Sequence, residues 1–172
     1  MSGRNSPNAA NRVIAFIALG SNLDNPERQV LRGFDELAQL PDSTLTARSS
    51  LYASAPVGYT DQPDFINAVA QLETALPSRD LLAALLAIEQ KHGRKRDMPN
   101  GPRTIDLDLL LYADLQYATV DLVIPHPRMH NRAFVLLPLT EIAADCEIPG
   151  KGLARDWLPQ VDQQSIKKLK TT

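Results

Sequence analysis

The sequence between residues 101 and 112 reads GPRTIDLDLLLY, which places Asp106 and Asp108 inside an otherwise apolar run. In an extended strand alternate side chains share a face. We therefore expect both carboxylates on one face and the alternate apolar residues Ile105, Leu107, Leu109 and Leu111 on the other. Ionised carboxylates in apolar surroundings need a partner or a metal, and paired oxygen ligands suit Mg²⁺. The pattern alone is equally compatible with a strand end that carries solvated acids.

Periodicity and turn residues place further elements on either side of this strand. We expect strands over residues 13–19, 45–52 and 65–73, helices over 26–41, 78–92 and 134–142, and a short last helix within 158–169. Pro26 is suited to a helix start, and Ser78 can cap the second helix, which Gly93 ends. Pro and Gly punctuate residues 54–63 and 94–103, so both segments are predicted to be loops.

The order of these elements, β-α-β-β-α-β, predicts an α+β fold of the ferredoxin-like split βαβ type. In that fold an antiparallel sheet has helices packed on it, and here a C-terminal extension follows. We expect residues 1–12 to be a flexible segment and 13–172 a single domain. The chain has neither the Gly-rich phosphate loop ending in Lys-Ser or Lys-Thr nor the dinucleotide fingerprint. A phosphate ligand would therefore be held by side chains and metal, to which Arg103 could contribute a cation.

Composition describes an ordinary globular protein, with 172 residues, 44% hydrophobic and 22% charged. A formal net charge of -2 argues against a general nucleic-acid binder, because sequence-independent binding to a polyphosphate backbone needs many basic groups. Cys146 is the single cysteine, which excludes an internal disulfide and a thiolate metal site. The polar N-terminus lacks the apolar core of a signal peptide, so we expect a cytoplasmic protein.

Five motifs in order give the chain a close resemblance to the hydroxymethyldihydropterin pyrophosphokinase family. They are ALGSNL at 18–23, SSLYASAPVG at 49–58, DQPDFINAV at 61–69, GPRTIDLDLLLY at 101–112 and IPHPRMHNRAFVLLPL at 124–139. The resemblance covers about residues 13 to 145 and implies the same ferredoxin-like fold. It implies an ATP-dependent diphosphokinase of folate biosynthesis that transfers pyrophosphate from ATP to 6-hydroxymethyl-7,8-dihydropterin and releases AMP.

The resemblance also implies roles for the charged residues. Asp106 and Asp108 match acids that hold two Mg²⁺ ions between ATP and the acceptor hydroxyl. The residues matching ATP contacts are Glu89, Arg94, Arg96, Arg103, His126 and Arg132. Among these, Arg94 and Arg96 match catalytic arginines on a loop that closes over the substrates. Without the resemblance, the arginine loop would be read as a solvated charged segment and His126 as a packed histidine.

A pterin is a flat heterocycle with hydrogen-bonding edges, so its pocket should combine aromatic faces with amide groups. Phe65 and Phe134 match the two aromatics that stack on the ring in the family, and Asn67 can hydrogen-bond its edge. Ser54, Val57 and Gly58 match the loop that completes the pocket. The residues alone would leave both phenylalanines in the core.

Three positions depart from the family pattern. Asn100 lies where a loop tryptophan often occurs, Leu86 replaces a glutamine seen in some relatives, and Pro127 replaces a tyrosine. These changes concern nucleotide contacts and loop closure. Trp157 lies outside the motifs, and no function is assigned to it.

Two other functions are open on the residues. The chain could be a non-catalytic pterin or nucleotide sensor, or a ferredoxin-like nucleic-acid binder whose sheet stacks bases. Retained acids and arginines argue against the first, and 5% aromatic content without a basic surplus argues against the second. We expect small-molecule partners, no nucleic acid, no membrane, and a monomer.

Overall fold

The computed structural model describes residues 11–56, 60–93 and 104–170. Its main sheet has the strand order β10-β3-β4-β1-β5, with β2 also paired to β4, and all pairs are antiparallel. The strands are β1 (Val13–Ser21), β2 (Ser43–Arg48), β3 (Tyr52–Ser54), β4 (Phe65–Thr74), β5 (Asp106–Tyr112) and β10 (Ile166–Lys168). With β1 between β4 and β5, the sheet confirms the predicted split βαβ arrangement.

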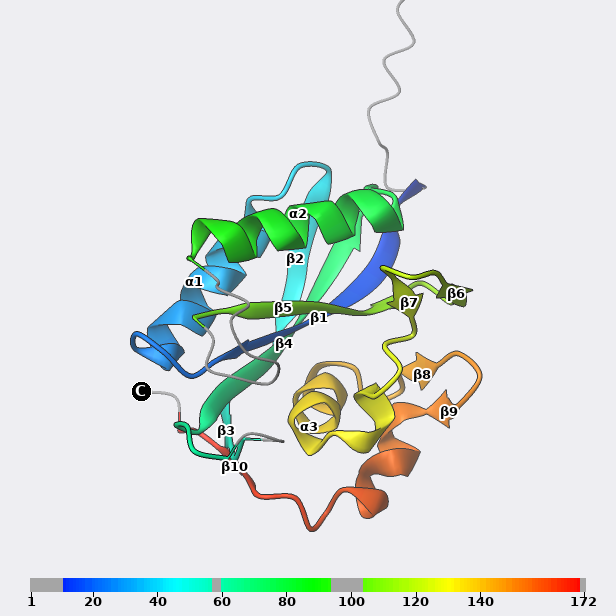
Figure 1. The fold of residues 1–172 in the computed structure, drawn as a ribbon. Coiled ribbons are helices and arrows are strands. Elements are labelled where there is room, and N and C mark those ends of the chain that lie inside the picture. The colour runs from blue at the N-terminus through cyan, green and yellow to red at the C-terminus, as the bar shows by residue number, and fades with distance from the viewer. Residues whose placement is uncertain (1–10, 57–59, 94–103, 171–172) are drawn as a thin grey trace, which may run out of the picture.

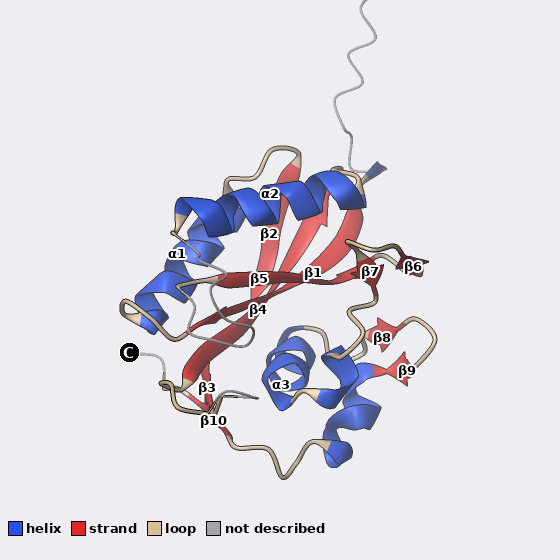
Figure 2. Cartoon of the chain, in the orientation of Figure 1, coloured by secondary structure: helices blue, strands red, loops and turns tan. Residues whose placement is uncertain are grey.

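Helices cover both faces of this sheet (Figure 1). The first two, α1 (Pro26–Ala38) and α2 (Ser78–Lys91), lie on one face, and α3 (Ala133–Ile142) lies on the other. Figure 2 shows the strands as a layer between these helices. The remaining elements are β6 (Tyr117–Ala118), β7 (Val123–Ile124), β8 (Glu147–Ile148), β9 (Gly152–Leu153) and the 3-10 helices η2 (Met129–Asn131) and η3 (Ala154–Gln160).

Alternation along β1 divides the core into two clusters. Ile17 and Leu19 pack with α1 and α2, whereas Phe16 and Ala18 face α3 and the C-terminal elements. Because successive side chains of a strand point to opposite faces, one central strand supplies both cores.

A β-bulge in β5 changes one predicted orientation. Phe16 pairs with Leu111 and Ile17 pairs with Leu109, so Leu110 is an extra residue without an opposite partner. Leu107 and Leu109 pack toward α1 and α2 as expected, but Leu111 lies in the α3 cluster. The expectation that Leu111 shares a face with Leu109 is therefore wrong.

Three other expectations are corrected by the structure. The strand predicted over 45–52 is divided into β2 and β3, because at Ser49 the side-chain Oγ rather than the backbone carbonyl accepts the N–H of Val69. The helix predicted within 158–169 is wrong, since η3 ends at Gln160 and β10 then pairs with β3. Ser78 is the first residue of α2 rather than its cap, which is Pro77.

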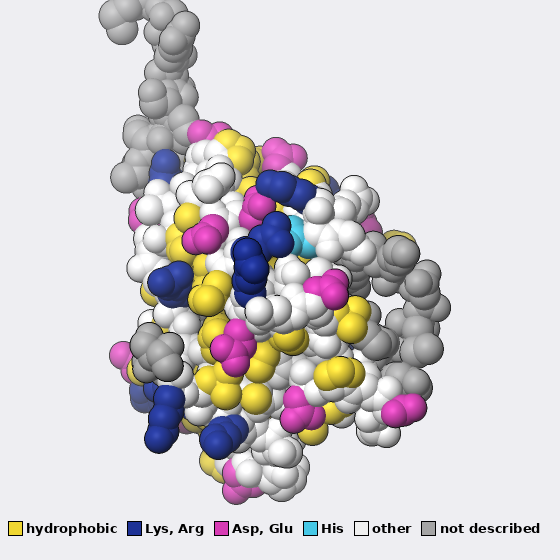
Figure 3. Space-filling model, turned by 90° about the vertical axis from the view of Figure 1, so that its left-hand side faces the viewer, with side chains coloured by type: hydrophobic (Ala, Val, Ile, Leu, Met, Phe, Trp, Pro, Cys, Tyr) yellow, Lys and Arg dark blue, Asp and Glu magenta, His cyan; other side chains and the backbone are white. Residues whose placement is uncertain are grey.

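The helices and one face of the surface can be described by their apolarity and their charge. In the part of the chain that the structure describes, no helix has the length and apolarity required for a membrane span. Figure 3 shows basic and acidic side chains interspersed on the face turned to the viewer.

Candidate functional site

Two rows of paired residues across β4, β1 and β5 form the floor of the candidate site. In one row Gly20 pairs with Asn67 on one side and with Asp106 on the other. In the next row Ala18 pairs with Val69 and Asp108. Paired residues in a sheet point to the same face, so the amide and both carboxylates project on the side of α3. The small central residues of β1 leave open space between them.

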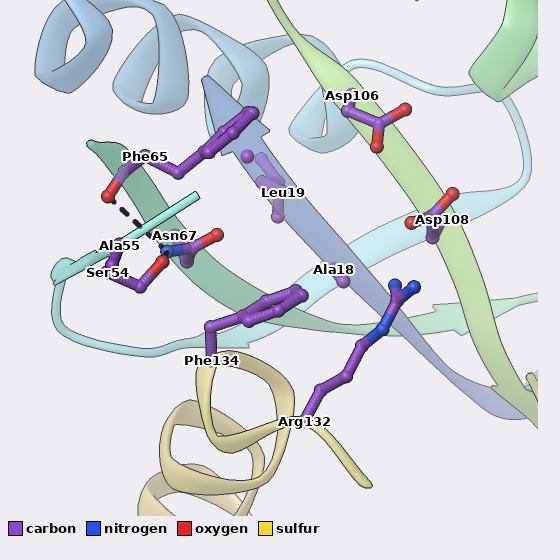
Figure 4. Close-up of a pocket in the computed structure, with 11 residues that line it drawn as sticks. Ala18, Leu19, Ser54, Ala55, Phe65, Asn67, Asp106, Asp108, Arg132 and Phe134 are labelled. Atoms are coloured by element: carbon purple, nitrogen blue, oxygen red, sulfur yellow. Dashed lines mark hydrogen bonds between the residues drawn. The ribbon is translucent and has the colours of Figure 1, made fainter. Parts of the chain in front are cut away.

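Two aromatic side chains stand over this floor (Figure 4). Phe65 comes from the start of β4 and Phe134 from the first turn of α3. They line one pocket together with Ser54, Ala55 and Arg132, and the two acids stand on the β5 side of it. The Arg132 guanidinium carbon lies 5.4 Å from the centre of the Phe134 ring, which is within cation-π range. A flat ligand between the rings would thus meet the amide and the carboxylates.

Hydrogen bonds fix the orientation of Asn67, which is 4% exposed. Its Nδ2 donates to Ser54 Oγ at 2.6 Å and to the carbonyl oxygens of Tyr52 and Phe65 at 3.4 and 3.5 Å. Carbonyl oxygens only accept, so they identify this end of the amide as the NH₂ group. Oδ1 is on the Gly20 side, where a Cβ built on Gly20 would lie 3.4 Å from it. Asn67 therefore offers the pocket an acceptor.

A second hollow lies on the outer side of β5 and shares three residues with the first. Asp106, Asp108 and Arg132 line both. The other walls come from α2, from the β6–β7 hairpin and from the segment after it: Leu82, Leu86, Glu89, Val120, Leu122, Val123, His126 and Pro127. The carboxylates thus stand where two hollows meet, one aromatic and one with an apolar wall.

Glu89 anchors β5 beside this second hollow. Its side chain is buried, and Oε2 accepts a hydrogen bond from the backbone N–H of Leu107 at 2.8 Å. Leu107 lies between the two aspartates, so the contact fixes the strand at the acid pair.

His126 is held as a neutral imidazole. Burial lowers its pKa to about 4, assisted by the positive charges of Arg132 and Arg128, while the carboxylate of Asp106 acts in the opposite direction. Its Nδ1 accepts a hydrogen bond from the Arg128 N–H at 3.2 Å. The remaining nitrogen, Nε2, therefore carries the proton and is the ring's donor.

The donor set fits a cation that retains other ligands. Among the described residues, no group of three or more His, Cys, Asp or Glu side chains is placed to hold a metal ion. Two carboxylates alone suit Mg²⁺, which commonly uses one or two protein carboxylates together with water and phosphate oxygens. They do not suit zinc, which prefers three or four nitrogen and sulfur ligands.

Several predicted site residues come together, and others lie outside the described part. The structure brings Ser54, Phe65, Asn67, Asp106, Asp108, Arg132 and Phe134 around the first pocket, with Glu89 and His126 at the second hollow. Val57, Gly58, Arg94, Arg96 and Arg103 fall outside the described residues. Two departures from the family pattern, Leu86 and Pro127, both line the second hollow.

Four residues that line the first pocket are not among the predicted site residues, and one of them is Ala55, which follows β3. Ala18, Leu19 and Gly20 contribute to the pocket from β1. The small residues of the ALGSNL motif were the available signal, because a strand that ends in Gly-Ser can approach a ligand closely. Trp157 packs in the α3 cluster and makes an edge contact with His130 at 4.8 Å between ring centres.

Comparison with known proteins gives consistent matches. The sequence model of the family described as 7,8-dihydro-6-hydroxymethylpterin-pyrophosphokinase matches residues 16–144. A Pseudomonas aeruginosa protein named 2-amino-4-hydroxy-6-hydroxymethyldihydropteridine pyrophosphokinase is 48% identical over 154 residues, covering 90% of this chain and 95% of that protein. A Haemophilus influenzae protein of the same name is 43% identical over 157 residues, covering 91% of this chain and 98% of that protein.

Solved structures agree on the fold. The wild-type HPPK-DHPS of Plasmodium falciparum with pteroate has a TM-score of 0.71 at 13% identity, covering 91% of this chain and 46% of that one. The present chain thus spans about half the length of that structure. At this identity the likeness concerns the fold alone.

Proposed function

The chain belongs to the 7,8-dihydro-6-hydroxymethylpterin-pyrophosphokinase family, and on that basis we propose that it transfers pyrophosphate from ATP to 6-hydroxymethyl-7,8-dihydropterin. The products are the pterin diphosphate and AMP, in a step of folate biosynthesis. The observation that carries the proposal is the pair of hollows that meet at Asp106, Asp108 and Arg132. A transferase with two substrates needs such a meeting point, because the reacting atoms must lie in contact.

The first pocket supplies the features that a pterin requires. Phe65 and Phe134 would stack on its two faces, and Asn67 Oδ1 would accept a hydrogen bond from an N–H on its edge. The acceptor hydroxyl would then point toward the acid pair. Val57 and Gly58 are proposed to complete the pocket from the loop after Pro56.

The second hollow would hold ATP. Its apolar wall, with Leu82, Leu86 and Leu122, suits a purine base, and Arg132 and the neutral His126 can donate hydrogen bonds to phosphate oxygens. Glu89 contributes through the position of β5. We assign Arg94, Arg96 and Arg103 to the triphosphate, with the first two completing the catalytic site.

The reaction is an in-line displacement at phosphorus. The hydroxymethyl oxygen forms a bond to the β-phosphorus of ATP, the bond from that phosphorus to the oxygen of the α-phosphate breaks, AMP leaves, and the hydroxyl proton passes to solvent. The side chains mainly align the two substrates and offset charge, as in other phosphoryl transfers. We propose that Asp106 and Asp108 hold two Mg²⁺ ions. Bound there, the ions would neutralise phosphate charge and polarise the acceptor hydroxyl.

The remaining proposals concern the state of the protein. We propose that it acts as a monomer in the cytoplasm, with small-molecule substrates only. Sedimentation of the purified chain, with and without both substrates, tests the first part.

AMP formation tests the function directly. Purified protein with ATP, Mg²⁺ and 6-hydroxymethyl-7,8-dihydropterin is expected to release one AMP for each pterin diphosphate formed. Omission of the pterin, or chelation of the metal, should abolish the product. If AMP does not exceed the chelated control while the pterin still binds, the chain is a non-catalytic binding protein and the proposal is wrong.

A further inference from the structure

The pterin pocket has two walls from distant parts of the chain. Ser54, the last residue of β3, and Ala55 after it form one wall, while Arg132 and Phe134 at the start of α3 form the other. In Figure 4 these walls stand on either side of the pocket. The width of the pocket, and hence the distance between the stacking surfaces, depends on what holds the walls together.

The side chain of Gln164, which lies between η3 and β10, forms hydrogen bonds to the backbone of the α3 wall. Its Oε1 accepts a hydrogen bond from the backbone N–H of Ala133 at 2.9 Å, and its Nε2 donates to the carbonyl of Asn131 at 2.8 Å. Ala133 is the first residue of α3, and Arg132, its N-cap, forms no side-chain cap hydrogen bond. Gln164 therefore acts as the cap from a distant part of the sequence.

The next residue of the same segment holds the opposite wall. The carbonyl of Ser165 accepts a hydrogen bond from the N–H of Ala55 at 3.3 Å, and Ile166 pairs with Ser54 at the start of β10. Residues 164 to 166 thus bridge the two walls with consecutive backbone and side-chain contacts. The bridge lies beyond residues 16–144, to which the family model extends.

We infer that Gln164 is a positioning residue for pterin binding, which fixes Arg132 and Phe134 relative to the wall formed by Ser54 and Ala55. Arg132 lies between Asn131 and Ala133, the two residues that Gln164 bonds. Fixing the backbone on both sides of an arginine restricts where its side chain can point. It also sets the first turn of α3, from which Phe134 projects. The inference rests on the proposed function in taking the ligand to be a pterin.

The matched pair Gln164→Ala and Gln163→Ala isolates this contact. Gln163 is exposed. With its amide oriented so that the NH₂ group meets acceptors, that group donates to the Asp162 carboxylate and to the Gln160 carbonyl, and neither contact involves the pocket. One hydrogen bond of Gln164 is part-buried and the other is exposed, and a loss of about 1 kcal/mol or slightly more corresponds to about tenfold in affinity. We expect Gln164→Ala to raise the pterin dissociation constant about tenfold and the ATP constant by a smaller factor, since Arg132 serves both substrates whereas Phe134 lines only the pterin pocket, and Gln163→Ala to match wild type.

A third variant separates positioning from general destabilisation. Gln164→Glu keeps an acceptor for the Ala133 N–H but turns a carboxylate oxygen toward the Asn131 carbonyl, so its pterin affinity should also fall below wild type. All constants are measured by equilibrium binding below each variant's melting temperature.

The inference is overturned if Gln164→Ala binds pterin as tightly as Gln163→Ala, or if Gln164→Glu binds pterin as tightly as wild type. It is equally overturned if pterin and ATP affinities fall in parallel with the melting temperature. Wild-type protein that binds pterin but forms no AMP would refute the proposed reaction and leave the binding comparison intact.

Discussion

The acid pair has a distinct position among the residues of the site, because it belongs to both hollows. A side chain at such a point acts mainly on the transfer itself rather than on the binding of one substrate. We expect Asp106→Asn and Asp108→Asn each to lower kcat about 100-fold or more, since charge stabilisation at the reacting centre is typically worth that much. Pterin affinity should change less than about threefold.

Rapid-quench measurement of AMP together with equilibrium pterin binding checks this expectation. Asparagine has nearly the same volume as aspartate, so neither substitution should disturb packing. A loss of rate in either variant is therefore not expected to arise from misfolding. Equal losses of rate and pterin affinity in both variants would contradict a role centred on the transfer.

Gly20 determines how closely a ligand can approach the floor of the pocket. A Cβ at this position would lie 3.4 Å from Asn67 Oδ1 and 4.0 Å from Phe65 Cδ1. The added methyl would contact the hydrogen-bonding amide and one stacking ring without a clash in the empty protein. Gly20→Ala should therefore weaken pterin binding about tenfold, by the loss of about one hydrogen bond, and leave the melting temperature nearly unchanged. Calorimetric titration measures the first quantity, and unaltered pterin affinity would show that the ligand lies elsewhere.

His126 makes stability depend on pH. Its pKa is lowered from 6.5 to about 4 in the folded chain, so between these values the unfolded chain binds more protons than the folded one. The free energy of unfolding must then fall as pH decreases through this window, by about 3 kcal/mol at its lower end.

Urea unfolding of metal-free protein at several pH values tests this dependence against His126→Asn, which does not titrate. As pH falls from about 6.5 to about 4, the free energy of unfolding of wild type should fall relative to that of His126→Asn. Parallel curves would mean that the histidine is not held neutral.

At the scale of elements, the sequence predicted the parts with local signals and missed those set by pairing partners. Alternation in Val13–Ser21 and Phe65–Thr74 and the apolar stripe of α2 depend on neighbouring residues, so they were visible. The bulge at Leu110 and the strand Ile166–Lys168 depend on β1 and β3, and no local composition reports such partners.

The same distinction applies to the candidate site. The two aspartates share a face within one strand, so the local pattern revealed their arrangement. The row Asn67–Gly20–Asp106 joins three strands whose register is fixed only by folding, and the sequence could not reveal it. Resemblance to a family supplied Asn67 and Asp106 as site residues, but it supplied neither Gly20 between them nor their alignment.

The attachment of α3 to the sheet allows a prediction for an element. Glu141 near its end accepts hydrogen bonds from the Ser50 N–H at 3.1 Å, from Ser50 Oγ at 2.8 Å and from the Tyr52 hydroxyl at 2.7 Å. Burial raises the pKa of this carboxyl, but the hydrogen bonds from Tyr52 and Ser50 outweigh it and lower the pKa overall. The contact ties α3 to the junction of β2 and β3.

A double-mutant cycle with Glu141→Gln and Tyr52→Phe measures this contact. We expect each single change to lower the free energy of unfolding by about 1 kcal/mol, and the double change to cost less than the sum. Additive losses would show that the two side chains act independently.

For the whole molecule, the shared wall between the two hollows predicts that the substrates bind cooperatively. A nucleotide in the second hollow would pair its phosphates with Arg132, and the Mg²⁺ that accompanies it would offset the charges of Asp106 and Asp108; all three residues also face the pterin pocket. The pterin would then meet a wall that is already ordered and neutralised, so its binding would lose less conformational freedom. A non-hydrolysable ATP analogue with Mg²⁺ should therefore tighten pterin binding about five- to twentyfold, and the pterin should tighten analogue binding by the same factor. Fluorescence titration in both orders of addition measures the two factors. Arg132→Ala should reduce both of them. If each substrate bound wild type with an affinity independent of the other, the two hollows would not be coupled through their common residues.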